Sequence, residues 1–147
     1  MKKLLLTIAV TTLGLFSAQA QEETNSNAPQ IVFEQETIDY GTIPQNSNGE
    51  REFLFTNTGK EPLIISNARG SCGCTVPTWP KEPIAPGAQG VIKVKYDTKR
   101  VGPFHKTVTL QTNAATPTKV LTIKGKVEPA PQEKTTPEKE GKSKVSM

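Results

Sequence analysis

The residues with the clearest capacity for chemistry are two cysteines separated by one glycine, Cys72-Gly73-Cys74. On a regular strand, residues two apart point to the same side with Cα atoms about 6.5–7 Å apart, the upper limit for a disulfide. Gly73 would let the chain pucker and shorten that distance. Such a bond would be strained and easily reduced, and its small loop would contribute little to stability.

The sequence leaves four interpretations of this pair open. Cys72 and Cys74 could form a structural disulfide, or pack as two small buried thiols. They could be a redox-active dithiol, for which Arg69 is the nearby positive residue that would lower a thiol pKa. They could bind a soft metal such as Cu(I), or bridge to another chain. Zinc is disfavoured because it needs four ligands and the other strong candidate, His105, is expected to be a lone surface histidine.

Other catalytic patterns are missing from the sequence. A single histidine without a Gly-x-Ser-x-Gly elbow argues against a hydrolase triad. No phosphate-binding or dinucleotide-binding glycine motif occurs. Trp79 stands between prolines, where it could form an exposed binding platform, but we expect it to cover one end of the core. We therefore predict no enzymatic activity and no cofactor.

The charge balance excludes a nucleic-acid partner. The 147 residues contain 18 Lys and Arg and 14 Asp and Glu, a net charge of +4. Without Lys2 and Lys3, which belong to the export signal described next, 16 basic residues face 14 acidic ones, or +2. These charges are interleaved and form no basic stripe.

The N-terminus predicts export. Met1–Lys3 is a short positive segment, Leu4–Phe16 is apolar, and Ala18 and Ala20 form the A-x-A pattern of a cleavage site. Cleavage after Ala20 would leave Gln21 as the new N-terminus. The apolar run, about 13 residues, is shorter than the roughly 20 needed to span a bilayer. We expect a periplasmic or secreted protein without a transmembrane segment after cleavage, its cysteines in an oxidising compartment.

Composition divides the rest of the chain into three parts. Residues 21–30 are polar and predict a flexible N-terminal lead. Residues 31–128 contain short segments of alternating apolar and polar residues. Residues 129–147 are rich in Pro, Lys and Glu, which predicts a disordered tail that acts as a solvated spacer.

The alternation within residues 31–128 predicts strands, because one face of each segment would be buried. Six or seven short strands separated by Gly, Pro and Asn indicate an all-β fold, an immunoglobulin-like antiparallel β-sandwich of about seven strands. Asn57–Lys60 predicts a tight hairpin into a strand at 62–65, and Pro86-Gly87 predicts a type II turn. The predicted core residues are Phe53, Phe55, Ile92, Val94, Tyr96, Phe104, Val108, Leu110, Leu121, Ile123 and Val127.

Two strings carry a resemblance to a known family: FTNTGKEPLII at residues 55–65 and GSCGCT at residues 70–75. They resemble the domain of unknown function 1573 family over about residues 31–127. The resemblance implies an exported bacterial protein of a kind frequent in Bacteroidota, with an immunoglobulin-like fold related to Hydin and major-sperm-protein domains. It also singles out Cys72 and Cys74 as positions that match the family pattern. Further matching positions are Pro80, Ile84 to Gly87, Tyr96-Asp97, Gly102 and Thr112-Asn113.

Two classes of function follow. The first is an exported non-catalytic module that binds a protein or cell-envelope partner through strand edges or end loops. The alternative is a periplasmic thiol-redox or Cu(I)-binding protein that acts through Cys72 and Cys74.

Overall fold

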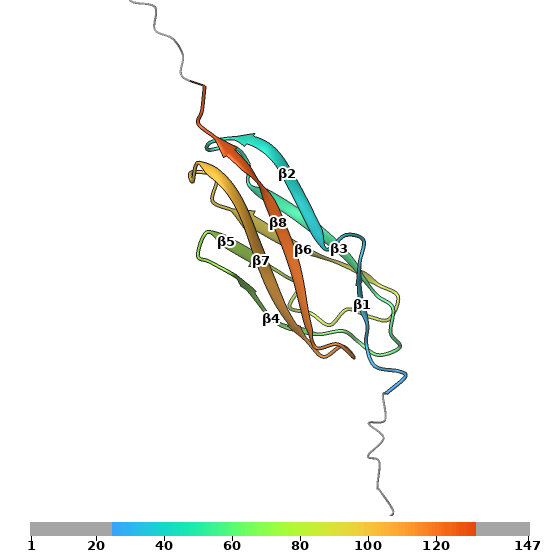
Figure 1. Cartoon of the computed structure of the whole chain (residues 1–147). Coiled ribbons are helices and arrows are strands. Elements are labelled where there is room, and N and C mark those ends of the chain that lie inside the picture. The colour runs from blue at the N-terminus through green and yellow to red at the C-terminus, as the bar shows by residue number, and fades with distance from the viewer. Residues whose placement is uncertain (1–24, 132–147) are drawn as a thin grey trace, which may run out of the picture.

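The computed structural model describes residues 25–131, which form two four-stranded sheets packed face to face (Figure 1). The predicted signal segment with its cleavage site at Ala20 and Gln21, and residues 132–147 of the predicted tail, lie outside the described residues. Within residues 25–131, no helix is long and apolar enough to cross a membrane. The strands are β1 (Ile31–Phe33), β2 (Thr37–Pro44), β3 (Glu50–Asn57), β4 (Ile65–Gly70), β5 (Thr75–Thr78), β6 (Gln89–Tyr96), β7 (Gly102–Thr112) and β8 (Thr118–Glu128).

The strand order is β1-β3-β6-β5 in one sheet and β2-β8-β7-β4 in the other. The predicted immunoglobulin-like sandwich is confirmed, with two corrections. It has eight strands rather than about seven, and the β2–β8 pair is parallel. The parallel pair arises because the N-terminal segment changes sheets: β1 pairs with β3, and β2 continues beside β8 in the same direction.

The alternating side chains form the core as predicted. Phe53 and Phe55 of β3 and Ile92 and Val94 of β6 are at most 1% exposed. Each such side chain contributes roughly 1.5–3 kcal/mol on burial. Aromatic rings extend the core toward one end, where the Tyr96 and Phe104 rings stack at 3.9 Å between centroids. The other predicted core residues are all buried as well: Tyr96, Phe104, Val108, Leu110, Leu121, Ile123 and Val127.

The tight hairpin predicted at Asn57–Lys60 is wrong, because β3 and β4 belong to different sheets. The connection between them is organised by Asn57, whose side chain is fully buried. Its amide donates to the carbonyls of Glu61 (2.8 Å) and Ile84 (3.0 Å), and its Oδ1 accepts the N–H groups of Gln30 (3.3 Å) and Gly59 (3.0 Å). The asparagine that predicted a hairpin thus joins four backbone groups by hydrogen bonds. Of the predicted strand at 62–65, Leu63 forms a single β-bridge with Ile84, and Ile65 is the first residue of β4.

Of the predicted flexible lead, residues 25–30 lie within the described structure and contact loops at one end of the sandwich. The carbonyl of Pro29 accepts the N–H of Ala115 (2.9 Å), and that of Gln30 accepts the N–H of Thr58 (2.9 Å). The composition of this segment is polar, but its buried residue, Pro29, lies against the loops at this end of the sandwich.

The predicted type II turn is confirmed. Gly87 has φ 76°, which a glycine adopts at no steric cost, and Ala88 donates to the carbonyl of Ala85 at 3.0 Å.

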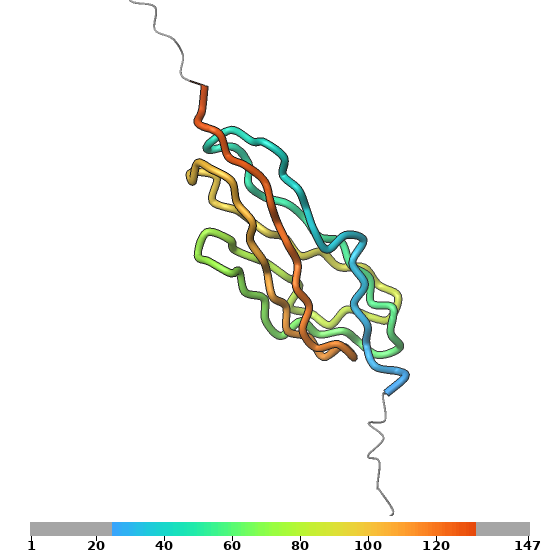
Figure 2. The backbone as a smooth tube through the Cα atoms, viewed as in Figure 1, coloured from blue at the N-terminus to red at the C-terminus, as the bar shows by residue number. Residues whose placement is uncertain are grey.

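The backbone trace shows that the loops gather at the two ends of the sandwich (Figure 2). The disulfide end consists of residues 45–49, 71–74 and 97–101, joined by hydrogen bonds from Asn46 to Thr98 and from Asp97 to Cys74. The asparagine end consists of residues 25–30, 57–64, 84–88 and 113–117. The cysteines and Asn57 therefore lie at opposite ends.

Candidate functional site

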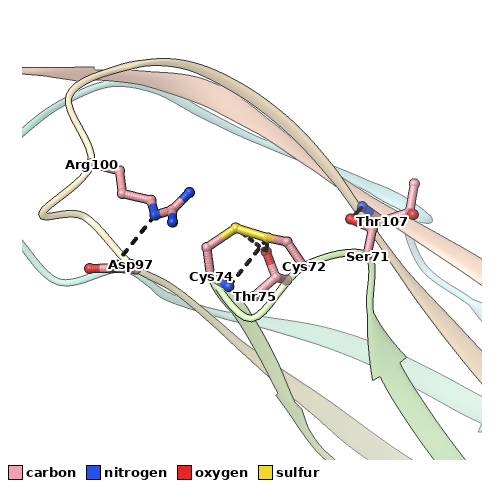
Figure 3. Close-up of a disulfide and its surroundings, with 7 residues drawn as sticks. All are labelled: Ser71, Cys72, Cys74, Thr75, Asp97, Arg100 and Thr107. Atoms are coloured by element: carbon pink, nitrogen blue, oxygen red, sulfur yellow. Dashed lines mark hydrogen bonds and ion pairs between the residues drawn. A yellow bond between two sulfur atoms is a disulfide. The ribbon is translucent and has the colours of Figure 1, made fainter.

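Cys72 and Cys74 lie in the turn that carries the chain from β4 in one sheet to β5 in the other (Figure 3). Their sulfur atoms are at disulfide distance, and their Cα atoms are 5.2 Å apart. The N–H of Thr75 donates to the carbonyl of Cys72 at 3.2 Å, which closes the turn. The wider Cα spacing expected on a regular strand does not apply, because both cysteines precede β5.

The two cysteines have unequal surroundings. Cys74 is buried, with 6% of its surface exposed, whereas Cys72 is only partly buried. The backbone N–H of Cys74 donates to the Sγ atom of Cys72 at 3.3 Å. The hydroxyl of Thr75, a residue that is 2% exposed, lies 3.7 Å from the Cys72 sulfur and 3.8 Å from the Cys74 sulfur. One buried hydroxyl therefore contacts both sulfur atoms.

The turn is fixed to both sheets. Ser71 and Thr107 of β7 exchange two hydrogen bonds, with Ser71 N–H donating to the Thr107 carbonyl (2.8 Å) and Thr107 N–H donating to Ser71 Oγ (3.1 Å). On the other side, the N–H of Asp97 donates to the carbonyl of Cys74 at 2.9 Å. These contacts hold the disulfide at a defined position between the sheets.

The charged residues near the disulfide include one that the sequence suggested and two that it did not. Arg69, the predicted positive neighbour, is exposed on β4 opposite Thr109. The structure adds an ion pair between Arg100 and Asp97 (3.8 Å), on the side of Cys74 (Figure 3). Local sequence reasoning missed these two residues because they come from the β6–β7 loop, far along the chain.

A surface hollow of about 410 Å³ opens beside the disulfide. It lies between the ends of β4 and β5, and Cys72 lines it. Cys74 is not among the lining residues. The lining consists of Ala68, Arg69, Gly70, Ser71, Cys72, Gly73, Thr75, Val76 and Pro77.

The remaining candidate residues lie as follows. His105 is exposed on β7, opposite Lys124, as expected for a lone surface histidine. Among residues 25–131, no group of three or more His, Cys, Asp and Glu residues is placed to hold a metal ion. Trp79 packs against the core as expected, and its indole N–H donates to the carbonyl of Ile65 at 3.0 Å. The Nζ atom of Lys81 lies 3.1 Å from the centre of the Trp79 ring.

Buried tyrosines border the disulfide end. Burial raises the pKa of Tyr40 to about 12, and its hydroxyl donates to the carbonyl of Gly49 at 2.9 Å. Burial also raises the pKa of Tyr96, which lies opposite Thr75 in the β5–β6 pair. Burial therefore favours the neutral form of both phenols.

The side of the sandwich bounded by β4 and β5, here the closed flank, offers little to a partner strand along β5. The carbonyl of Cys74 accepts a hydrogen bond from the N–H of Asp97, just after β6. In an antiparallel pair, alternate residues bond to the partner strand, so the backbone groups of Thr75 and Pro77 point away from β6. The N–H of Thr75 donates to the carbonyl of Cys72, and Pro77 has no backbone N–H. Proline at an edge strand is one way in which proteins prevent unwanted pairing.

The opposite side, here the open flank, is bounded by β1 and by the first residues of β8, 118–121. The bonds of Gln30 and Glu34 to β3 leave Ile31 and Phe33 with their backbone groups directed away from that strand. On the outer face beside this edge, Val32 is 51% exposed and Leu54 is 39% exposed.

The start of β8 is uncovered on the same flank. Thr122 donates to the carbonyl of Glu36, so Val120, two residues earlier, directs its backbone groups to the same edge. Pairing with β2 begins only at Thr122, and within residues 25–131 no strand lies beside Val120 on that side. An ion pair between Lys119 and Glu36 (2.6 Å) crosses the gap. A hollow of about 250 Å³ lies here, lined by Gln30, Ile31, Val32, Ala114, Ala115, Thr116 and Lys119.

Solved structures with the same fold come from diverse proteins. A protein of unknown function from Porphyromonas gingivalis W83 matches with a TM-score of 0.61 at 12% identity, over 69% of this chain and 48% of that one. The PapD-like domain 7 of human CEP192 matches with a TM-score of 0.59 at 9% identity, over 86% of this chain and 100% of that one. The Vibrio cholerae VesB protease matches with a TM-score of 0.52 at 15% identity, over 71% of this chain and 33% of that one.

These similarities establish the fold alone, because identities this low carry no function. The chain spans about half the length of the Porphyromonas protein. A comparison with curated protein sequences finds no match. The family model described as protein of unknown function (DUF1573) matches residues 31–127, which include the strands of both sheets and the Cys72-Gly73-Cys74 turn. The chain belongs to the DUF1573 family.

Proposed function

We propose that this protein is an exported, non-catalytic β-sandwich module that binds a protein partner of the cell envelope at its open flank. The observation that carries the proposal is the pair of exposed apolar side chains, Val32 and Leu54, beside the unpaired edge of β1. Isolated exposed apolar residues need no explanation, but apolar residues next to free backbone donors and acceptors suit a strand from another protein.

A partner strand would use two kinds of contact. Its backbone would pair with the outward groups of Ile31 and Phe33 on β1 and of Val120 at the start of β8, which border the same flank and supply affinity. Its alternate side chains would lie on the outer face beside Val32, or enter the hollow near Lys119. Because β1 has only three residues, the strand interaction would be short, and apolar contacts with Val32 and Leu54 would strengthen it.

The centre of the same outer face carries charged side chains. Lys93 of β6 forms ion pairs with Glu52 (3.2 Å) and Glu50 (3.8 Å) of β3. Exposed pairs of this kind contribute little to stability but make a surface costly to dehydrate. Beside β1, the apolar part of the face is the corner of Val32, Leu54 and the half-buried Val91, directly opposite Leu54, whereas the exposed Val76 lies at the far edge of the sheet on β5.

The test compares two valines of equal type and exposure. Val32→Asp places a charge in the proposed interface, while Val101→Asp places it in the β6–β7 loop, where Val101 is 50% exposed. Envelope extracts are passed over each immobilised variant and the captured proteins are identified by mass spectrometry. We expect the wild type and Val101→Asp to retain a common partner that Val32→Asp loses. Equal capture by both variants, or no specific capture by the wild type, would contradict the proposal.

The cysteines serve as an internal control. The predicted alternative, thiol-redox or Cu(I) chemistry at Cys72 and Cys74, uses the opposite flank. We therefore expect the double variant Cys72→Ser, Cys74→Ser to capture the same partner as the wild type. If this variant fails to capture the partner, the binding site lies at the disulfide end and not at the open flank.

Export is tested on the protein isolated from the cells that make it. The proposal requires a mature N-terminus at Gln21, which intact-mass measurement and N-terminal sequencing detect. A chain that retains residues 1–20 would contradict export by cleavage.

A further inference from the structure

We infer that the Cys72–Cys74 disulfide exchanges with a cysteine thiol of another polypeptide, and that Cys72 is the sulfur that is attacked. The reaction goes beyond partner binding at the open flank and does not depend on it, because the disulfide lies on the closed flank. Three features carry the inference: the greater exposure of Cys72 beside the hollow, hydrogen-bond donors at the sulfur atoms, and a hollow that suits a polypeptide.

Access selects Cys72. A thiolate must reach the disulfide sulfur that it attacks, so the more accessible cysteine is the expected target. Cys72 is partly buried and lines the hollow of about 410 Å³. Cys74 is 6% exposed and does not line the hollow. An incoming thiolate thus reaches Cys72 first and displaces Cys74.

The donors around the sulfur atoms stabilise the negative charge that the exchange produces. The N–H of Cys74 is directed at the Cys72 sulfur at 3.3 Å, the sulfur that is released in the second step of the exchange. The buried hydroxyl of Thr75 lies 3.7 Å from the Cys72 sulfur and 3.8 Å from the Cys74 sulfur. It can donate to whichever sulfur carries the charge. Hydrogen bonds to a charged form lower its pKa, and a leaving thiolate of lower pKa departs faster.

The exchange balances as follows. The incoming thiolate forms a bond to Cys72 Sγ, the Cys72–Cys74 bond breaks, and Cys74 leaves as a thiolate beside Thr75. A second thiol of the substrate then attacks the mixed disulfide and releases Cys72. Two electrons pass from the two substrate thiols to the protein, which becomes a dithiol, and their two protons end on Cys72 and Cys74. The substrate is left with a disulfide.

The shape of the hollow favours a polypeptide thiol over a small one. The hollow lies between the ends of two edge strands and includes Val76, which is 57% exposed, and the exposed Arg69. An extended peptide could insert its cysteine toward Cys72 and place neighbouring residues over Val76. A small thiol would contact only part of this surface.

The first test measures the two sulfur atoms separately. Cys74→Ser leaves Cys72 as a single thiol, and Cys72→Ser leaves Cys74. Each mature variant is reacted with a cysteine-containing peptide activated as its thionitrobenzoate disulfide, and the released chromophore is followed at pH 7. We expect Cys74→Ser to react about tenfold faster than Cys72→Ser in the folded protein, and at equal rates in denaturant. Equal rates in the folded protein, or faster reaction of Cys72→Ser, would overturn the inference.

The second test concerns the Thr75 hydroxyl, a positioning group rather than an attacking one. In the wild-type disulfide form, Thr75→Val removes the hydroxyl and Thr75→Ser keeps it. We expect Thr75→Val to slow attack by a cysteine peptide several-fold and Thr75→Ser to restore the rate. A Thr75→Ser variant as slow as Thr75→Val would show that packing at this position, not the hydroxyl, controls the rate.

The third test concerns the substrate. The wild-type disulfide is treated with the cysteine peptide or with free cysteine, and the mixed disulfide is located by mass spectrometry after acid trapping. Faster reaction with the peptide and a mixed disulfide on Cys72 are expected. Faster reaction with free cysteine would contradict the polypeptide assignment, and a mixed disulfide on Cys74 would contradict the assigned sulfur. A disulfide that resists both thiols unless the protein is unfolded would make it a structural brace and refute the exchange.

Discussion

The two flanks of the sandwich end their sheets in different ways. On the closed flank, Thr75 uses its outward N–H within the chain, Pro77 has none, and the disulfide lies at the crossover. On the open flank, β1 ends after three residues and the start of β8 has no neighbour on that side among residues 25–131. In one sandwich, therefore, the edge strand β5 is prevented from pairing with another strand, while the edges of β1 and of the start of β8 can pair.

The two flanks also depend on different internal supports. The buried amide of Asn57 holds the start of β1 through the N–H of Gln30. The closed flank depends on close backbone contact, since a side chain at Gly70 would collide with the carbonyl of Thr75. Substitutions at these supports should therefore have different sizes and different local consequences.

The largest expected effect is that of Asn57→Ala. It leaves backbone groups of Gln30, Gly59, Glu61 and Ile84 without the amide partner they have now. We expect a loss of about 2–4 kcal/mol in the free energy of unfolding, measured by urea denaturation. Asn67→Ala, at an exposed position of β4, is the matched control and should change stability by less than about 0.5 kcal/mol. Similar losses for both would refute the role of Asn57 as a support of the open flank.

Gly70→Ala should have the next largest effect. Its Cβ would meet backbone atoms of Thr75, which cannot move aside without shifting β5. We expect a loss of about 1–3 kcal/mol. Gly73→Ala is the control, because a Cβ there meets open space and the glycine has no positive φ. If the two variants have equal stability by thermal denaturation, the closed flank is not held by this contact.

Replacement of both cysteines by serine should cost less. The disulfide closes a loop of three residues, for which the chain-entropy relation gives about 1.5 kcal/mol. Denaturation of the double variant under the same conditions measures the difference. A loss above about 3 kcal/mol would mean that the disulfide is mainly a structural brace, and would weaken the case for exchange.

The smallest effect at neutral pH is that of Tyr40→Phe on β2, which loses the hydrogen bond to Gly49 and about 1 kcal/mol. The same variant has a larger effect on alkaline stability. Because the pKa of Tyr40 is raised from 10.0 to about 12 in the folded state, its contribution is complete below pH 10 and declines as the pH rises toward 12. Tyr40→Phe should therefore reduce the fall in stability between pH 10 and 12. An unchanged alkaline profile would contradict the assignment.

The sequence predicted the parts of the fold that depend on local alternation. Phe53 and Phe55, or Ile92 and Val94, reveal their buried face by a spacing of two, and all four are buried. The local pattern did not reveal β5, which has four residues and a proline. Nor did it reveal that Asn57 is a buried centre, because its partners lie up to 27 residues away.

The candidate site divides in the same way. The pair Cys72 and Cys74 was evident from its spacing. The different burial of the two cysteines was not evident from the sequence. It depends on the turn between the sheets, which buries Cys74 and places the Thr75 hydroxyl near both sulfur atoms. The open flank was also beyond local reasoning, since it arises from the point at which β2 begins to pair with β8.

The most direct measurement compares Val120→Pro with Val120→Ala in binding the partner captured by the wild type. Val120 is exposed, and its N–H faces the open flank, so proline removes a donor available only to an added strand. Alanine removes the side chain and keeps that donor. With both variants folded by circular dichroism, we predict that Val120→Pro loses the partner and Val120→Ala retains it. Retention of the partner by Val120→Pro would contradict strand pairing at the open flank.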